Sequence, residues 1–291
     1  MKLLVTGAAG MLGFDVLRVG EAAGHQLVAV DVDELDITDP RAVEGAFARI
    51  HPEAVLNCAA WTDVDGAESH REQAHAVNAD GPRNLAMAAA WERVPLVHVS
   101  TDYVFSGEAP VDATGTRRAY VESDPTGPRS VYGQTKLEGE REVLAASPRH
   151  AVARSAWLFG VGGRNFADTM LTLAAEQAGE SVRVVTDQVG CPTWTGHLAP
   201  ALLGLIERSV SGLVHLAGTG HVSWNGFAAE IFRQAEVGCR VEETTTEHMA
   251  RPAPRPAWSA LESERDDVIP LPPWQDGLAG YLAARAGMMR A

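Results

Sequence analysis

The chain has 291 residues, 46% of them hydrophobic, which is enough to fill the core of one large α/β domain or of two interleaved smaller ones and excludes a disordered chain. The formal net charge of -14 excludes a nucleic-acid surface, because phosphate binding needs clustered Lys and Arg. The three cysteines form no Cys-x-x-Cys pair and the first apolar run is too short for a signal peptide or a membrane span, so we expect a cytoplasmic protein with neither nucleic-acid nor membrane partners.

Short β-branched or leucine-rich runs alternate with longer helical stretches through the first half of the chain. The expected strands are residues 2–6, 26–31, 53–57 and 95–100, and the expected helices are residues 11–24, 40–51 and 70–93. Asp39 and Pro40 suit the N-cap and the first position of the second helix. Strands and helices that alternate in this way predict a parallel sheet.

The second half continues with helices and strands in a less regular order. The expected helices are residues 130–146, 166–178, 223–234 and 274–285, and the expected strands are residues 150–154, 182–186 and 213–216. Together the elements predict a Rossmann-type doubly wound parallel sheet, formed by residues 1–150 with later strands from about 181–222 added to it. Residues 151–180 and 223–291 are expected to form a smaller C-terminal α/β lobe that covers the substrate.

A Gly-x-x-Gly-x-x-Gly loop lies between the first expected strand and the first expected helix. Glycine lets the backbone turn tightly and approach a pyrophosphate, whose negative charge then rests against the helix N-terminus. A plain tight turn is the alternative, but the position straight after a strand favours dinucleotide binding. The loop makes residues 1–150 the expected NAD(P)-binding domain, with cofactor contacts from Gly7, Gly10, Met11, Leu12 and Gly13.

A carboxylate ends the second expected strand. Asp31 is placed to accept hydrogen bonds from the adenosine ribose hydroxyls, and we expect it to select the cofactor. Asp36 and Ile37 are expected to line the adenine pocket, whereas Asp33 and Glu34 also suit a solvated acidic loop. The expected cofactor is NADH or NADPH, with NADH at least as good, because no arginine nearby would neutralise a 2′-phosphate.

Three residues are candidates for the chemistry: Thr101 after the fourth expected strand, and Tyr132 and Lys136, which share one helical face. Reduction of a carbonyl by hydride leaves an alkoxide that needs a proton. A tyrosine with its ordinary pKa near ~10 supplies that proton poorly until a nearby ammonium stabilises the phenolate, so Lys136 is expected to provide the charge. Thr101 is expected to polarise the carbonyl. A lone Tyr-x-x-x-Lys pair also fits a surface aromatic beside a lysine, but the order of all the motifs favours one active site.

Longer strings add to these motifs. They are Asn57-Cys-Ala-Ala-Trp-Thr-Asp-Val-Asp-Gly-Ala-Glu68, Ser100-Thr-Asp-Tyr-Val-Phe105, Val131-Tyr-Gly-Gln-Thr-Lys-Leu-Glu-Gly-Glu140, Arg154-Ser-Ala-Trp157, Asp187-Gln-Val-Gly-Cys-Pro-Thr193 and Arg255-Pro-Ala-Trp-Ser259. In these strings the chain resembles, nearly end to end, the extended short-chain dehydrogenase/reductase family and within it the dTDP-4-dehydrorhamnose reductases. The resemblance implies an NAD(P)H-dependent oxidoreductase that reduces the 4-keto group of a dTDP-4-keto-6-deoxyhexose, with dTDP-4-dehydro-L-rhamnose as the expected substrate.

The same resemblance implies further cofactor contacts. Ala59, Ala60 and Trp61 are expected along the cofactor beyond the third strand, and Tyr132 and Lys136 are expected to touch the nicotinamide ribose as well.

It also implies which residues face the nucleotide sugar, namely Thr101, Asp102 and Trp157. An indole face packs well on the apolar side of a deoxyhexose, although Trp157 also fits a core tryptophan. Arg255 is expected at the pyrophosphate because of its bidentate donors, with Arg251 as the alternative.

The sequence allows more than one oligomeric state and more than one function. Certain members of the family resemble metal-bridged dimers held by glutamates, but Asp15 and Gly196 stand at the corresponding places here, so we expect no metal and either a monomer or a homodimer. Two alternative functions remain, which are a 4-ketoreductase for another nucleotide deoxysugar and a non-catalytic NAD(P)-binding regulatory subunit.

Overall fold

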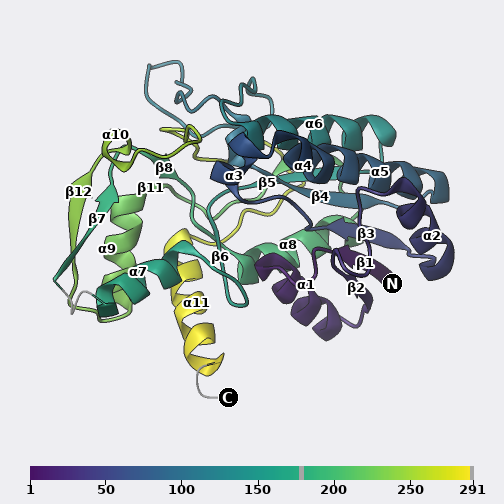
Figure 1. Ribbon diagram of the computed structural model, residues 1–291, viewed down its shortest axis with the longest axis horizontal. Helices are drawn as coiled ribbons and strands as arrows, with labels where there is room; N and C mark the ends of the chain where they lie inside the picture. Colours follow the sequence, from purple (N-terminus) through teal and green to yellow (C-terminus); the bar gives the residue numbers. More distant parts are fainter. Residues whose placement is uncertain (177–179, 289–291) are drawn as a thin grey trace.

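The larger part of the molecule is built around a parallel sheet of six strands, ordered β10-β5-β4-β3-β1-β2 (Figure 1). The structure is a computed structural model that describes residues 1–176 and 180–288. The strands are β1 (Lys2–Thr6), β2 (Gln26–Val30), β3 (Ala54–Asn57), β4 (Leu96–Thr101), β5 (Ala151–Ser155) and β10 (Gly212–His215). The strand order reverses beside β1, and the expected Rossmann-type doubly wound fold is confirmed.

Helices cover both faces of this sheet (Figure 1). One face packs against α1 (Met11–Ala22) and α8 (Thr195–Glu207), through a core that includes Val16 and Leu202. The other face packs against α2 (Pro40–Ile50), α5 (Gly81–Glu92) and α6 (Val131–Ala146). The predicted cap at Asp39 is present, since its carboxylate accepts from Arg41 N–H, and the Ser130 hydroxyl caps α6 by accepting from Gly133 N–H.

The single helix expected over residues 70–93 is interrupted. It consists of α4 (Arg71–His75), a π-helical turn (Ala76–Asp80) and α5, and an unexpected short helix α3 (Val64–Ser69) precedes it. The turn widens because Gly81 N–H donates to the carbonyl of Ala76, five residues back, while Pro82 has no N–H to continue the ordinary pattern.

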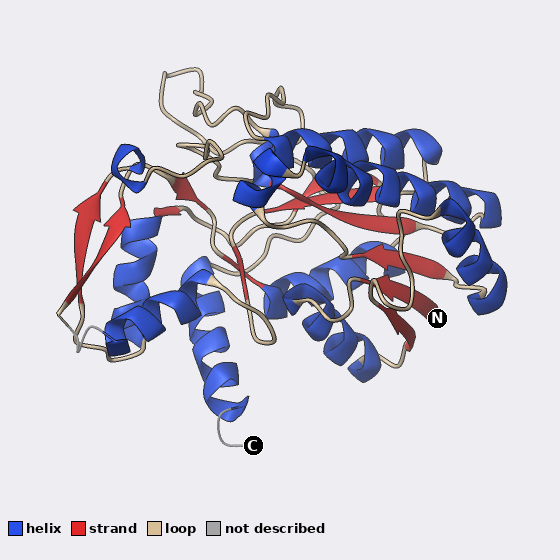
Figure 2. Cartoon of the chain, in the orientation of Figure 1, coloured by secondary structure: helices blue, strands red, loops and turns tan. Residues whose placement is uncertain are grey.

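A smaller lobe lies beside the large sheet, and Figure 2 shows its two-stranded sheet packed on helices. Strands β7 (Ser181–Val185) and β12 (Arg240–Thr244) pair in parallel. They pack with α7 (Phe166–Glu176), α9 (Trp224–Gln234) and α11 (Trp274–Met288) around a core that includes Phe227 and Tyr281. The remaining short elements are β6 (Leu158–Phe159), β8 (Val189–Gly190), β9 (Thr193–Trp194), β11 (Val222–Ser223) and α10 (Thr246–Met249).

The strands are distributed between the two parts differently from the expectation. The strand expected at residues 150–154 belongs to the large sheet as β5, since it pairs with β4 and β10. The strand expected at residues 182–186 does not join that sheet, because β7 pairs with β12, which the sequence analysis missed. Positions 177 and 178 of the expected helix 166–178 lie outside the described residues.

Helix α8 and strand β12 escaped the sequence analysis for physical reasons. Helix α8 contains Pro200, which usually indicates the end of a helix. Its apolar residues also surround the helix without a polar stripe, so the amphipathic pattern of a surface helix is missing. Strand β12 carries charged side chains and is only partly buried, so it lacks the apolar run of a central strand. Among the described residues, every helix is too short or too polar to cross a lipid bilayer.

A buried ion pair attaches α6 to the sheet. Arg154 on β5 donates from Nη2 to Glu140 Oε2 on α6 at 2.7 Å and from Nε to Oε1 at 2.9 Å. The Ser100 hydroxyl on β4 donates to the same carboxylate at 2.6 Å. The two charged side chains are 3% and 2% exposed, so each charge depends on the other for compensation.

We therefore predict that Arg154→Met destabilises the protein by about 3–5 kcal/mol, because it leaves the Glu140 carboxylate buried without a counter-charge. The double variant Glu140→Gln/Arg154→Met removes that charge and keeps an acceptor for Ser100, so it should recover most of the loss. Urea unfolding of the single and double variants tests this prediction. A double variant no more stable than Arg154→Met alone would contradict it.

Candidate active site

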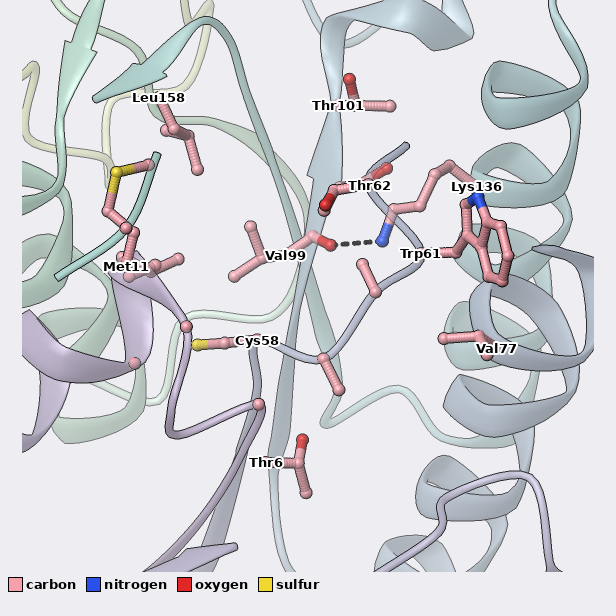
Figure 3. Close-up of a pocket in the computed structure, with 18 of the residues that line it drawn as sticks. Thr6, Met11, Cys58, Trp61, Thr62, Val77, Val99, Thr101, Lys136 and Leu158 are labelled. Atoms are coloured by element: carbon pink, nitrogen blue, oxygen red, sulfur yellow. Dashed lines mark hydrogen bonds between the residues drawn. The ribbon is translucent and has the colours of Figure 1, made fainter. Parts of the chain in front are cut away.

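A cavity of about 1020 Å³ opens where the strands of the large sheet end (Figure 3). Residues that follow β1, β2, β3, β4 and β5 all line it, since parallel strands present their carboxyl ends at one edge. Every residue that the sequence analysis assigned to the cofactor or to the sugar ring lies on its wall.

The glycine loop forms one end of the cavity. Gly7 has φ +67°, and a Cβ there would lie 2.5 Å from the backbone nitrogen of Ala59. A Cβ on Gly13 would lie 2.4 Å from the Gly7 carbonyl oxygen. No side chain caps α1 at Gly10, and Gly10, Met11 and Leu12 at this end of the helix line the cavity. A tight backbone around an uncapped helix N-terminus fits a dinucleotide pyrophosphate.

Acidic and apolar residues after β2 line the adjoining wall. Asp31 Oδ2 accepts from Ala9 N–H in the glycine loop at 2.9 Å, so this carboxylate also braces the loop. Asp36 and Ile37 line the cavity beside it. The neighbouring Asp33 and Glu34 are exposed and do not line it, in keeping with the solvated-loop alternative. The described lining residues of this segment, 31–38, include no arginine or lysine.

The segment after β3 runs along the middle of the cavity. Ala59, Ala60 and Trp61 line it, and Asn78 clamps the backbone of Trp61 from the π-helical turn. Trp61 N–H donates to Asn78 Oδ1 at 2.9 Å, and Asn78 Nδ2 donates to the Trp61 carbonyl at 3.2 Å. The π-helical turn that the sequence did not predict thus holds one wall of the site.

Thr101, Tyr132 and Lys136 all line the cavity. Thr101 Oγ1 donates to Asp102 Oδ1 at 3.1 Å and accepts from Tyr103 N–H at 3.2 Å. Burial raises the pKa of Tyr132 to about 12, although its hydrogen bond with the Thr101 hydroxyl acts in the opposite direction. Tyr132 therefore keeps its phenolic proton throughout the neutral range.

The position of Lys136 differs from the expectation. Its Nζ lies 2.7 Å from the Val99 carbonyl oxygen (Figure 3). The same atom lies 3.1 Å from His98 Nε2, and both partners are on β4. Burial lowers the pKa of Lys136 to about 8. In this arrangement burial raises the pKa of Tyr132 most, the Thr101 hydroxyl lowers it and the Asp102 carboxylate raises it.

Two residues expected at the sugar line the other end of the cavity. Asp102, in a short 3-10 helix (Asp102–Val104), is 2% exposed, and burial raises the pKa of its carboxyl to about 6. Its Oδ2 has no hydrogen-bond partner among the described residues. Trp157 is partly exposed with φ +48° and stacks on Trp224 with ring centroids 3.5 Å apart.

The sequence analysis missed several lining residues, among them Tyr103, Arg164 and Trp224. Tyr103 lies inside the quoted Ser-Thr-Asp-Tyr string, and its ring packs edge-on against Tyr132 at 5.5 Å. Trp224 follows the N-cap Ser223 of α9, a pattern that indicates a helix start but says nothing of the neighbouring cavity. Arg164 lies in a loop that has no recognisable motif.

Arg255 and Arg251, which were expected at the pyrophosphate, are not among the residues that line this cavity, and both pair with Asp65. Arg255 Nη2 donates to Asp65 Oδ2 at 2.8 Å, and Arg251 Nη1 lies 3.8 Å from the same oxygen. Because Asp65 belongs to α3, these ion pairs attach the C-terminal lobe to the segment after β3.

The positions compared with metal ligands make structural contacts. Asp15 is buried and accepts from the Thr195 hydroxyl at 2.6 Å and from Arg18 at 2.9 Å. A Cβ on Gly196 would lie 2.4 Å from the Trp194 ring. In the part of the chain that the structure describes, no three His, Cys, Asp or Glu side chains gather as a metal site would require.

Comparisons with known proteins show the family of the chain. The family model described as RmlD substrate binding domain matches residues 1–286. A probable dTDP-4,6-dihydroxy-2-methyloxan-3-one 4-ketoreductase from Streptomyces antibioticus is 43% identical over 96% of this chain and 93% of its own. A dTDP-4-dehydrorhamnose reductase from Streptomyces griseus is 42% identical over 98% of this chain and 94% of its own. The solved dTDP-4-dehydrorhamnose reductase of Bacillus anthracis in complex with NADP is 33% identical, with a TM-score of 0.92 over 97% of this chain and 99% of that one.

The glycine loop allows a matched test. Gly7→Ala is predicted to abolish binding of NADH and NADPH and to destabilise the fold, since the new Cβ would collide with Ala59 in a backbone conformation that favours glycine. Gly45 occupies an exposed position of α2 with nothing within 4 Å of an added Cβ, so Gly45→Ala should instead stabilise the fold by about 1 kcal/mol. Thermal unfolding and cofactor titration of both variants give the answer, and normal cofactor affinity in Gly7→Ala would refute this account of the loop.

Proposed function

Because the chain belongs to the family of the RmlD substrate binding domain, we propose that it reduces the 4-keto group of a dTDP-4-keto-6-deoxyhexose with NADH or NADPH, converting dTDP-4-dehydro-L-rhamnose to dTDP-L-rhamnose. The observation that carries this proposal is that Thr101, Tyr132 and Lys136 lie in one cavity with the glycine loop. The large sheet would bind the cofactor, and the lobe that contributes Trp224 would cover the sugar.

The residues of the cavity suit each part of a dinucleotide. The glycine loop and the N-terminus of α1 would hold the pyrophosphate, and Asp31 would accept from the adenosine ribose hydroxyls. The adenine would lie beside Asp36 and Ile37, and the segment 59–61 would follow the remainder of the cofactor. The bound nicotinamide supplies the hydride that goes to C4 of the sugar.

Tyr132 would provide the proton. With its pKa raised to about 12 by burial, the phenol is protonated at neutral pH, which is the form that reduction of a carbonyl requires. Thr101 lies beside this hydroxyl and would orient the substrate oxygen. Once the proton has left Tyr132, an ammonium on Lys136 would stabilise the phenolate.

Asp102 and Trp157 would position the sugar. Asp102 lines the cavity with Oδ1 accepting from the Thr101 hydroxyl, and its carboxyl would accept a hydrogen bond from a sugar hydroxyl held beside Thr101. The Trp157 indole would pack against the apolar side of the deoxyhexose.

A second candidate is reduction of a different 4-keto nucleotide deoxysugar, and the similarity to the Streptomyces antibioticus 4-ketoreductase supports it. The same catalytic residues serve both reactions, because stereochemistry depends on which face of the ring meets the hydride. The configuration at C4 of the product separates the two candidates. A non-catalytic regulatory subunit is disfavoured, since Thr101, Tyr132 and Lys136 are all retained in one cavity.

The mechanism predicts that Tyr132→Phe and Lys136→Ala each lower turnover by about two orders of magnitude or more while cofactor still binds, because general acid catalysis contributes roughly 10²- to 10⁴-fold. The assay follows NADH or NADPH oxidation with dTDP-4-dehydro-L-rhamnose present and absent. Tyr120→Phe is the control, since Tyr120 is buried against Phe105 and does not line the cavity. Near-normal turnover in Tyr132→Phe would rule out this mechanism.

Cofactor choice gives a separate prediction. Wild type should use NADH at least as well as NADPH, because the Asp31 carboxylate repels a 2′-phosphate by about 1–2 kcal/mol at ordinary salt. Asp31→Ala should move the ratio of kcat/KM values toward NADPH by roughly tenfold. Loss of the hydrogen bond to Ala9 would weaken both cofactors, so the ratio is the informative quantity. Asp33→Ala is the control, and a tenfold NADPH preference in wild type would overturn the role of Asp31.

A further inference from the structure

Four buried polar side chains form a continuous line from β1 across the sheet to α6. They are Thr6, Asn57, His98 and Lys136, and each is at most 1% exposed. Thr6 Oγ1 donates to Asn57 Oδ1 at 2.7 Å, Asn57 Nδ2 lies 2.9 Å from His98 Nδ1, and His98 Nε2 lies 3.1 Å from Lys136 Nζ. Because these side chains are buried, the protons between them are shared within the line and with the adjoining backbone. Thr6 and Lys136, at the two ends of the line, also line the cavity.

One backbone group decides how Asn57 is oriented. The N–H of Ala59 points at Asn57 Oδ1 with a distance of 3.0 Å, and a backbone N–H can only donate. The atom it meets must therefore be the amide oxygen. The amide NH2 of Asn57 then faces His98 Nδ1 and donates to it.

The orientation of Asn57 sets the tautomer of His98. Burial holds the pKa of His98 well below its usual value, and Lys136 acts in the same direction, so the imidazole is neutral and carries one proton. Since Nδ1 accepts from Asn57, that proton is on Nε2. His98 therefore presents an N–H to the nitrogen of Lys136.

The protonation state of Lys136 follows from counting donors and acceptors. An ammonium has three donors and no acceptor, so in this position it would direct N–H against the Nε2–H of His98. A neutral amine has a lone pair that accepts from His98 and still donates to the Val99 carbonyl at 2.7 Å. Reversing the Asn57 amide does not help, because its NH2 would then face the N–H of Ala59.

Building on the proposed function, we propose that Asn57 and His98 are positioning residues that favour the neutral amine of Lys136 where it contacts Val99 and His98. The ammonium that supports Tyr132 then forms by proton uptake from solvent as the side chain leaves His98. The backbone N–H of Ala59 is the fixed donor that orders the line.

With a pKa of about 8, Lys136 is mainly an ammonium at pH 7 and mainly a neutral amine above pH 8, so the contact with His98 belongs to the neutral fraction. Glu140 on α6 and Cys58 after β3 would raise the pKa of Lys136, but burial outweighs them and the pKa falls to about 8. The Glu140 carboxylate is already bound by Arg154 and Ser100. Cys58 stays a neutral thiol at neutral pH because burial raises its pKa to about 12. Tyr132, on the same helix, is also neutral there.

The sequence makes a direct measurement possible, because Lys2 and Lys136 are its only lysines. We would label the full chain with [ε-¹³C]lysine, assign the two signals with Lys2→Arg, and titrate without added cofactor. Lys136 should titrate near pH 8, and ¹⁵N spectra of His98 should show the proton on Nε2. An Nδ1–H tautomer of His98, or an ordinary pKa of about 10.4 for Lys136, would overturn the proposal.

The variant Asn57→Asp is designed to reverse the direction of the hydrogen bond to His98, and Asn78→Asp controls for the added negative charge. Asn57→Asp replaces the donor that faces His98 with an acceptor, so the proton of His98 should move to Nδ1 and the pKa of Lys136 should rise by about one unit or more. Asn78→Asp adds a carboxylate at another fully buried asparagine, which bonds Trp61 and Thr135 and makes no contact with His98. An equal rise in Asn78→Asp would refute the role of the tautomer.

These readouts do not depend on turnover. A chain that shows the predicted tautomer and titration but leaves the nucleotide sugar unchanged would refute the proposed function and keep this inference. If Asn57→Asp fails to fold, the wild-type tautomer and titration still decide the question.

Discussion

The active site depends on one constraint, which is that parallel strands present their carboxyl ends at the same edge of the sheet. β1 pairs with β3 and β3 pairs with β4, so Gly7, Ala59 and Thr101 reach one cavity although they are distant in the sequence. The strand order reverses beside β1, where open α/β sheets bind their ligands. Short segments after each strand are therefore enough to assemble a dinucleotide site, and the lobe completes it with Trp224.

Helix α6 supplies the second requirement, because it must hold Tyr132 at a fixed place against β4. Two buried polar side chains of this helix, Lys136 and Glu140, each have a partner on the sheet, Val99 and Arg154. Removal from water makes these contacts strong and also shifts protonation, so that the pKa of Tyr132 rises while that of Lys136 falls. The interactions that fix the helix thus also set the protonation states on which the proposed reduction depends.

The parts of the site that follow from local patterns were predictable, and those that follow from distant contacts were not. The glycine loop, Asp31 and the Tyr132–Lys136 spacing are short motifs next to recognisable strands and helices. The ion pair of Arg255 was not predicted because its partner, Asp65, lies far away in the sequence. The direction in which the Lys136 side chain points was also not predicted, since it depends on His98 and Val99 of strand β4. In the fold, β12 and α8 escaped because charged residues and Pro200 conceal their patterns.

Transfer of deuterium from the cofactor tests the central claim most directly. The protein would be incubated with dTDP-4-dehydro-L-rhamnose and NADH or NADPH deuterated at the transferable position, and the product analysed by mass spectrometry and NMR. The account predicts one deuterium per product molecule, bound to C4 of a sugar in the rhamno configuration. A folded protein that binds the cofactor but places no deuterium at C4 of this or any other dTDP-4-keto-6-deoxy sugar would contradict it.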